Sequence, residues 1–232
     1  MINIRTVEHL SEWLPSLKEA SSAHRTLMQE TMDRFPVRIS THLAKRLPHS
    51  QVLRAQFLPD PQEVTTLDGM THCFKGLLHT GIGNVERMYV DRCIIMPQPT
   101  CPAYCRYCFR KFYEHGEGKA MSTKDLDLAA NYVAQDDRIR EVLITGGEPI
   151  MDQARLSRLL VSLARIDHLD VVRIACRSLI MDPGLVNRSL IALLKSYQDL
   201  RAGRVVEVAM HCNHVDEISP KTIDALARLR ES

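Results

Sequence analysis

Three cysteines stand close together near the middle of the chain, in the pattern C-x3-C-x2-C at Cys101, Cys105 and Cys108. A cubane [4Fe–4S] cluster has four irons, and each needs a thiolate or a substitute ligand. Three thiolates on one loop can bind three irons and leave the fourth open to a small molecule. The pattern therefore favours a reactive iron–sulfur centre over a cluster that only carries electrons.

Zinc is the main alternative for these thiolates, with His115 near enough to serve as a fourth ligand. The spacing alone does not decide between zinc and iron–sulfur. A disulfide framework is disfavoured, because the seven cysteines are an odd number and a chain of this length does not need covalent staples. We interpret the other cysteines as buried apolar residues: Cys73, Cys93, Cys176 and Cys212.

A second motif follows one predicted βα unit downstream. The β-branched run Glu141–Thr145 is closed by Gly146, Gly147, Glu148 and Pro149. Glycines at the end of a strand let the backbone approach a ligand closely, and the proline ends the strand pairing. Backbone carbonyls and the Glu148 carboxylate can accept the three donors of a ligand ammonium. Alone, this motif fits an ordinary βα turn; beside the cysteine loop it favours an iron–sulfur site.

Together the two motifs resemble those of radical S-adenosylmethionine (SAM) enzymes. Further segments are similar to the lysine 2,3-aminomutase family: Phe35–Ile39, Cys105–Arg110, and His211–His214 followed by Glu217 and Ile218. The resemblance begins near Phe35 and is strongest over Cys101–Pro149 and His211–Ile218. It implies a [4Fe–4S] cluster that donates one electron to bound SAM, giving a 5′-deoxyadenosyl radical that abstracts hydrogen from unactivated carbon.

The resemblance also implies roles for single residues. It assigns the cluster to Cys101, Cys105 and Cys108, the SAM amino group to Gly146, Gly147, Glu148 and Pro149, the region of the adenine to Tyr107, and further SAM contacts to Arg177 and His211. It assigns the carboxylate of an amino-acid substrate to Arg110, for which a guanidinium fork is suited. Without the resemblance, Arg110 would be one more solvated base and His211 a hydrogen-bonded structural histidine.

Aminomutases of this family also use pyridoxal phosphate (PLP), bound by a lysine in a glycine-rich loop near their C-terminus, and this sequence contains no such loop. Glu148 replaces the aspartate common in these aminomutases, and Cys176 replaces a small residue, so the lysine substrate stays open. Three hypotheses remain: a 2,3-aminomutase acting on an amino acid or on a lysyl side chain of a translation factor; a radical SAM enzyme without PLP; and a non-catalytic iron–sulfur or zinc module.

Composition agrees with an intracellular enzyme. The chain has 232 residues, 45% of them hydrophobic, and a formal net charge of +2, so neither nucleic acid nor a membrane surface is an expected partner. No apolar run approaches the roughly 20 residues that span a bilayer. Reduced thiols and an oxygen-sensitive cluster fit the cytoplasm. We expect a one-electron donor such as flavodoxin or ferredoxin, and a homo-oligomer is compatible with the sequence.

The elements that must position these motifs follow from periodicity. Strands are predicted at Arg92–Met96, Glu141–Thr145, Val171–Ala175 and Val205–Met210. Amphipathic helices between them begin near Ser122, Asp152, Asp182–Pro183 and Ser219–Pro220, where capping residues stand. Short apolar strands that alternate with amphipathic helices predict βαβ units on a parallel sheet, and hence an α/β fold. The resemblance implies that this sheet curves into a partial (β/α) barrel.

The chain divides into two predicted regions. Residues 1–86 form a mostly helical N-terminal region, with helices across Val7–Ala20, interrupted near Pro15, and around Ala23–Asp33. Residues 87–232 form the radical SAM core. The resemblance implies six βα units in such a core, but the periodicity supplies four. We therefore expect the chain to be a fragment of a longer protein, because a four-stranded remnant would leave a parallel edge unpaired.

Overall fold

The computed structural model describes residues 1–65, 78–87, 89–112, 118–200 and 205–231. Its largest element is a six-stranded sheet with the order β3-β4-β5-β6-β7-β8. The strands are β3 (Leu78–His79), β4 (Val85–Arg87), β5 (Arg92–Gln98), β6 (Glu141–Gly146), β7 (Val171–Cys176) and β8 (Val205–Met210). Strands β5 to β8 pair in parallel, and β3 and β4 are antiparallel. Within the described residues the sheet stays open, with β3 and β8 at its edges.

The four parallel strands confirm the prediction, and they alternate with helices as an α/β fold requires. The two antiparallel strands were not predicted, because segments of two and three residues are too short to show a period. Strand β4 covers the outer edge of β5. Of the two edges that a four-stranded parallel sheet would have, the described structure therefore leaves only that of β8 without a neighbouring strand.

Three of the predicted helices begin where their caps stand: α6 (Thr123–Gln135), α7 (Gln153–Leu163) and α10 (Pro220–Arg230). Ser122 and Asp125 form a capping box at the start of α6, in which each side chain accepts a hydrogen bond from the other residue's backbone N–H. Such reciprocal bonds satisfy donors that the first helical turn leaves unpaired, and so they fix the point where the helix begins.

The remaining helix, α9 (Arg188–Leu200), begins later than predicted. Asp182 does not start it, because Asp182 ends the short helix α8 (Ser178–Met181) and is followed by a 3-10 turn over Pro183–Leu185. The cap of α9 is Asn187, whose side-chain oxygen accepts the backbone N–H of the third helical residue at 3.0 Å. The prediction failed here because an Asp-Pro pair starts a turn as readily as a helix.

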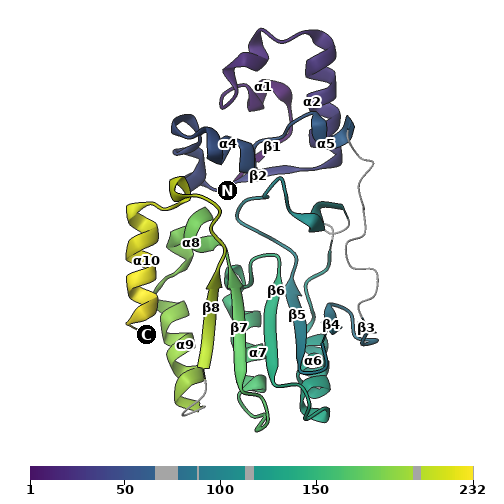
Figure 1. Cartoon of the computed structure of the whole chain (residues 1–232), viewed down its shortest axis with the longest axis vertical. Helices are drawn as coiled ribbons and strands as arrows, with labels where there is room; N and C mark the ends of the chain where they lie inside the picture. The colour runs from purple at the N-terminus through teal and green to yellow at the C-terminus, as the bar shows by residue number, and fades with distance from the viewer. Residues whose placement is uncertain (66–77, 88, 113–117, 201–204, 232) are drawn as a thin grey trace.

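Helices α6, α7 and α9 cover one face of the sheet (Figure 1). The alternate residues that point toward these helices are fully buried: Val142, Ile144, Val172 and Ile174. The opposing stripe of α7 is buried as well, at Leu156, Leu159, Leu160 and Leu163. Successive strand residues point to opposite faces, so Leu143 and Arg173 lie on the other face, where they are half-buried. The packed face makes the sheet a rigid support for the loops at its carboxyl edge.

The N-terminal region lies at the carboxyl edge of the parallel strands, above the sheet in Figure 1. Its two strands, β1 (Ile2–Ile4) and β2 (Val37–Ile39), form an antiparallel pair. Its helices are α1 (Val7–Leu10), α2 (Ser22–Arg34), α3 (Thr41–Ala44), α4 (Gln51–Phe57) and α5 (Gln62–Thr65). The helix predicted across Val7–Ala20 is shorter than expected: α1 ends at Leu10, before Pro15, and a separate 3-10 helix over Pro15–Lys18 follows.

This region has its own apolar core, and two residues from the rest of the chain belong to it. They are Ala103, from the segment that carries the three cysteines, and Met181 of α8. The N-terminal region therefore packs directly on the loops at the carboxyl edge of the sheet. The boundary predicted between residues 86 and 87 falls within β4. None of the described helices has the length and apolar character needed to cross a lipid bilayer.

Candidate functional site

The three cysteines lie on the loop that follows β5, between the carboxyl edge of the sheet and the N-terminal region (Figure 1). Backbone hydrogen bonds coil the end of this loop: the N–H of Cys108 donates to Cys105 O at 3.1 Å, and the N–H of Lys111 donates to Cys108 O at 3.1 Å. A 3-10 helix over Phe109–Phe112 follows. The strand end, as predicted, presents all three thiols on one loop.

The loop is fastened to the end of β6 by backbone contacts. Gly147 N–H donates to Gln98 O and Glu148 N–H donates to Thr100 O, each at 2.8 Å. A Cβ on Gly147 would lie 2.3 Å from the Thr100 carbonyl oxygen, and Gly146 adopts a φ of +104°. Only glycine fits such a close approach and such a backbone angle. The two glycines thus bring the cysteine loop against the strand end, a role that the sequence did not indicate.

The side chain of Gln98, the last residue of β5, satisfies this junction. Its amide nitrogen donates to Thr100 O at 2.7 Å and to Glu148 O, while its oxygen accepts the Thr100 N–H at 2.7 Å. Gln98 is buried, so without these bonds it would be costly to desolvate. This residue could not be identified from the sequence, because a glutamine beside prolines carries no motif of its own.

On its other side the loop is bound by the N-terminal region. Tyr104 N–H donates to Arg38 O at 2.9 Å, and Arg106 N–H donates to Gln56 O at 2.8 Å. The Arg106 guanidinium donates to the carbonyls of Phe35 and Pro36 at 3.2 and 3.1 Å. The Phe35–Ile39 segment, noted for its resemblance, therefore holds the cysteine loop through its backbone carbonyls.

Glu63 of α5 adds a buried ion pair to this contact. Its Oε1 accepts a hydrogen bond from Arg106 Nε and its Oε2 one from Arg106 Nη2, each at 2.9 Å. Oε2 also accepts a hydrogen bond from Lys111 Nζ at 2.8 Å. Burial alone would raise the pKa of Glu63, but the two cations bring it below its usual value. Both cations belong to the cysteine loop, so α5 helps to fix the loop in place. Sequence analysis missed Glu63 as well.

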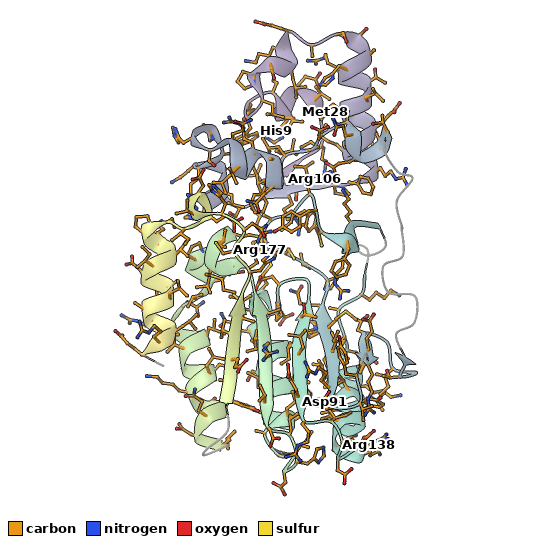
Figure 2. The ribbon with its side chains drawn as sticks, in the orientation of Figure 1. His9, Met28, Asp91, Arg106, Arg138 and Arg177 are labelled. Atoms are coloured by element: carbon orange, nitrogen blue, oxygen red, sulfur yellow. The ribbon has the colours of Figure 1, made fainter. Side chains whose placement is uncertain are left out.

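Arg177, directly after β7, is the centre of a second buried group of polar residues. Its Nη1 lies 2.7 Å from Cys105 Sγ, and its Nη2 donates to Gln56 Oε1 at 2.6 Å and to Glu217 Oε1 at 3.1 Å. Phe57 and Tyr107 lie on its guanidinium, with ring centres 5.2 and 5.0 Å away. Figure 2 shows Arg177 and Arg106 between the N-terminal region and the sheet, far from Asp91 and Arg138.

Asn213 completes this group, which we call the Arg177 network: Gln56, Phe57, Cys105, Tyr107, Arg177, Asn213 and Glu217. The Asn213 amide donates to Gln56 Oε1 at 3.0 Å and to the Tyr107 hydroxyl at 2.7 Å. Its backbone N–H donates to Glu217 Oε2 at 3.1 Å. Arg177, predicted as a SAM contact, is thus bonded in this structure to residues of the protein itself, including one predicted cluster ligand.

Glu148 lies beside this network and is almost fully buried. Its Oε2 accepts the backbone N–H groups of Arg177 at 2.7 Å and of Ser178 at 3.1 Å. Burial raises the pKa of this carboxyl group to about 7, although these two donors act in the opposite direction. Its other oxygen, Oε1, has no hydrogen-bond partner among the described residues.

Three further buried polar atoms have no partner in the described chain: Gln56 Nε2 and Arg177 Nε of the Arg177 network, and Ser178 Oγ next to it. Buried polar atoms are normally hydrogen-bonded, so a group of unpaired ones is a candidate place for a ligand or for ordered water. The free oxygen of Glu148 suits an ammonium group, and the two free N–H donors suit an acceptor such as a carboxylate. A ligand that carries both, as the methionine part of SAM does, fits this donor and acceptor set.

Burial makes the three thiols of the loop harder to deprotonate. Burial raises the pKa of Cys101 well above its usual value, and the charges of Glu148 and Cys105 add to the effect. Burial likewise raises the pKa of Cys105 to about 11, against the opposing charge of Arg177. Burial raises that of Cys108 too, and the Arg110 backbone N–H opposes it. Cluster binding must therefore release protons from this loop.

The remaining predicted site residues lie in different places around the cysteine loop and the Arg177 network. Pro149 begins a 3-10 turn after Glu148. Tyr107 belongs to the Arg177 network, and His211, exposed after β8, lies edge-on to it with ring centres 6.0 Å apart. Arg110 has its guanidinium 5.3 Å from the Phe109 ring centre, and its backbone N–H faces the Cys108 sulfur. The structure therefore brings Tyr107 and His211 together.

The alternative ligands are placed only in part. Cys73 and His115, the latter considered as a zinc ligand, lie outside the described residues. Cys93 and Cys176 are buried in the apolar core, as predicted, whereas Cys212 is half-buried and its Sγ donates to His214 O at 3.4 Å. In the described chain, no three His, Cys, Asp or Glu side chains converge on one metal ion. A four-iron cluster does not require such convergence, because its thiolates bind different irons.

Comparison with known proteins gives the family. A model described as the radical SAM superfamily matches residues 95–231, from β5 through α10. This range covers more than half of the chain, and it contains the three cysteines, the Gly146–Pro149 segment and the Arg177 network residues of the core. The chain therefore belongs to the radical SAM superfamily.

Similar curated proteins are aminomutases. The chain is 26% identical to a putative L-lysine 2,3-aminomutase of Aquifex aeolicus, over 97% of this chain and 60% of that protein. It is 24% identical to the L-lysine 2,3-aminomutase of Clostridium subterminale, over 99% of this chain and 54% of that protein. It is 30% identical to a glutamate 2,3-aminomutase of Clostridioides difficile, over 63% of this chain and 34% of that protein. The chain thus spans no more than 60% of the length of these relatives.

Proposed function

We propose that this chain binds a [4Fe–4S] cluster through Cys101, Cys105 and Cys108 and uses it to cleave SAM. The observation that carries the proposal is the position of the free Glu148 oxygen and the free Arg177 Nε beside the loop of three cysteines. When bound, cluster and SAM supply a 5′-deoxyadenosyl radical that removes hydrogen from the substrate. The protein supplies position and shielding from water.

The chain's own residues divide this work. Glu148 accepts the SAM ammonium with its free oxygen, and its ionised form is stabilised by that positive charge. Gly146 and Gly147 hold the cysteine loop close to this carboxylate, so thiols and carboxylate face one ligand. Tyr107 and His211 form the exposed side of the site, where a planar adenine can stack or pair with the backbone.

We further propose that the reaction is a 2,3-aminomutase reaction on an α-amino acid. The names of the relatives support this, and because they include both lysine and glutamate aminomutases the side chain of the substrate stays open. Arg110 carries the substrate carboxylate in this proposal, since its guanidinium stands next to Cys108 on the cysteine loop.

The test of the cluster is anaerobic reconstitution with iron and sulfide. We expect about four irons and four sulfides per chain, with a brown chromophore. Replacement of Cys101, Cys105 or Cys108 by alanine should abolish the chromophore. The matched control is Cys93→Ala, which removes a buried thiol of the sheet core and should leave the chromophore intact. Stoichiometric zinc without sulfide in the wild-type chain would refute the proposal in favour of a zinc module.

The aminomutase part is tested in the full-length protein with C3-deuterated amino acids. Deuterium should enter 5′-deoxyadenosine with the correct substrate. Arg110→Lys should keep the cluster and weaken substrate affinity by roughly ten- to a hundredfold, because lysine offers a point charge in place of a planar fork. If no α-amino acid transfers label while SAM is still cleaved, a radical SAM reaction without PLP replaces the aminomutase proposal.

A further inference from the structure

We propose that Arg177 is a positioning residue that sets the reduction potential of the cluster through Cys105, and that Glu217 limits how much of its positive charge reaches the cluster. The inference rests on the proposed cluster. It adds to the proposed SAM contact of Arg177 Nε, because the other two guanidinium nitrogens contact Cys105 Sγ and the Glu217 carboxylate.

The Arg177 guanidinium is held by contacts on both of its faces and at both terminal nitrogens. The rings of Phe57 and Tyr107 lie 5.2 and 5.0 Å from its carbon, and Gln56 Oε1 accepts its Nη2 at 2.6 Å. With Nη2 engaged in this way, Nη1 is turned to Cys105 Sγ at 2.7 Å. A fixed donor next to one sulfur acts on the charge of that sulfur without any motion of the arginine.

Glu217 supplies the opposing charge. Its side chain is fully buried, and its two oxygens are taken by Arg177 Nη2 at 3.1 Å and by the Asn213 backbone N–H at 3.1 Å. Arg177 and Glu217 form a buried ion pair, and each group offsets part of the cost of burying the other. The field that reaches Cys105 is therefore that of a cation partly balanced by a carboxylate on its far side.

The direction of the effect follows from the charge that reduction adds. A reduced cluster carries one more negative charge, so a nearby cation stabilises it and raises the reduction potential. Hydrogen bonds to ligating sulfurs act in the same direction. Burial strengthens both effects, because a low local dielectric screens them less than water does. Removal of Arg177 should therefore lower the potential, and removal of the Glu217 charge should raise it.

The experiment is a redox titration of the anaerobically reconstituted chain, followed by the EPR signal of the reduced cluster. Arg177→Met should lower the potential, and Glu217→Gln should raise it, each on the order of tenfold in the one-electron equilibrium constant, or about 59 mV. Arg177→Lys, which keeps the charge but not the fork, should fall between wild type and Arg177→Met. Arg173→Met is the matched control, since it removes an arginine of β7 that does not contact the cysteine loop, and its potential should equal that of wild type.

Opposite signs distinguish this role from a structural one, because loss of packing would move both variants the same way. Shifts of equal sign, or no shift in Glu217→Gln, would overturn the proposal. If Arg177→Met fails to hold the cluster, Glu217→Gln and Arg177→Lys still decide the question. A wild-type chain that binds no iron and sulfide would instead refute the proposed function, which reconstitution reveals before any titration begins.

Discussion

Two arginines four positions apart, Arg173 in β7 and Arg177 just after it, each contact acidic side chains but in opposite surroundings. Arg173 bridges Glu141 of β6 and Glu207 of β8 at 2.6 and 2.7 Å, and 35% of its side chain is exposed. Arg177 contacts Glu217 with 10% of its side chain exposed and the carboxylate fully buried. The contacts of Arg173 cross neighbouring strands. The contact of Arg177 with Glu217 joins the end of β7 to the turn after β8, and its further contacts with Gln56 and Cys105 reach the N-terminal region and the cysteine loop.

The difference in exposure distinguishes ion pairs that link strands of the sheet from an ion pair beside the candidate site. Half-exposed ion pairs such as those of Arg173 gain little, because water screens them and long side chains lose freedom. The Arg177 pair is shielded from water, and so it bears a large desolvation cost that apolar residues of similar size would avoid. A charge kept at such a cost next to a cysteine of the site is best explained by the site's chemistry.

The largest effect expected from this comparison is on stability after Arg177→Met. The substitution leaves Glu217 buried without its cation, so the free energy of unfolding should fall by roughly 3–5 kcal/mol. Urea denaturation of the metal-free chain measures this as a lower midpoint at unchanged slope. Combining Arg177→Met with Glu217→Leu should recover part of the loss, because no buried charge then remains unpaired. No recovery in the double variant would mean that Arg177 contributes by packing alone.

A second prediction concerns Glu148 and pH. Its pKa is raised from the usual 4.5 to about 7 by burial. In the unfolded chain the group ionises near pH 4.5, whereas in the folded chain it keeps its proton until pH 7. This contribution to stability is therefore complete below pH 4.5 and is lost as pH rises to about 7, in total on the order of 3 kcal/mol at about 1.36 kcal/mol per pKa unit.

The measurement is the unfolding free energy of the metal-free chain at several pH values between 4.5 and 7. Glu148→Gln should remove this part of the pH dependence, because glutamine does not titrate. Glu141 and Glu207, whose side chains are 17% and 44% exposed, serve as controls, and their glutamine variants should leave the slope in place. An unfolding free energy of the wild type that does not change with pH over this range would contradict the prediction. It would show that water reaches the Glu148 carboxyl group.

The sheet itself could be predicted from the sequence because its signal is local. Runs such as Val171–Ala175 and the caps at Ser122 and Ser219 report on their own segment, and their elements appear where expected. The start of α9 was predicted wrongly because its signal is not local. Asp182 and Asn187 are both plausible caps, and the choice depends on how α8 packs, which no short window of sequence contains.

The site was predictable only where residues of one motif act together. The cysteine loop and Gly146–Glu148 could be assigned to one centre from their motifs. Gln56 and Glu63 could not, because their partners are far away along the chain: Gln56 bonds Arg177 across 121 positions, and Glu63 bonds Arg106 across 43. Gln98 bonds Thr100 nearby, but its role depends on Glu148, 50 positions away. Hydrogen bonds such as those of Gln56 and Glu63 become visible only after the N-terminal region is placed on the carboxyl edge of the sheet.

The smallest effect expected is that of Arg173→Met, and it tests the other half of the comparison. Loss of two half-exposed ion pairs should lower the unfolding free energy by about 0.2–1 kcal/mol, since water solvates the freed Glu141 and Glu207. The loss should shrink further in high salt, because exposed charges are screened over a few ångströms. Arg177→Met should keep its full loss in the same salt, since screening ions do not enter a buried pair. Urea denaturation at low and high salt gives both values. Two results would contradict this comparison. One is a larger decrease in unfolding free energy for Arg173→Met than for Arg177→Met, and the other is a decrease for Arg177→Met that disappears in high salt.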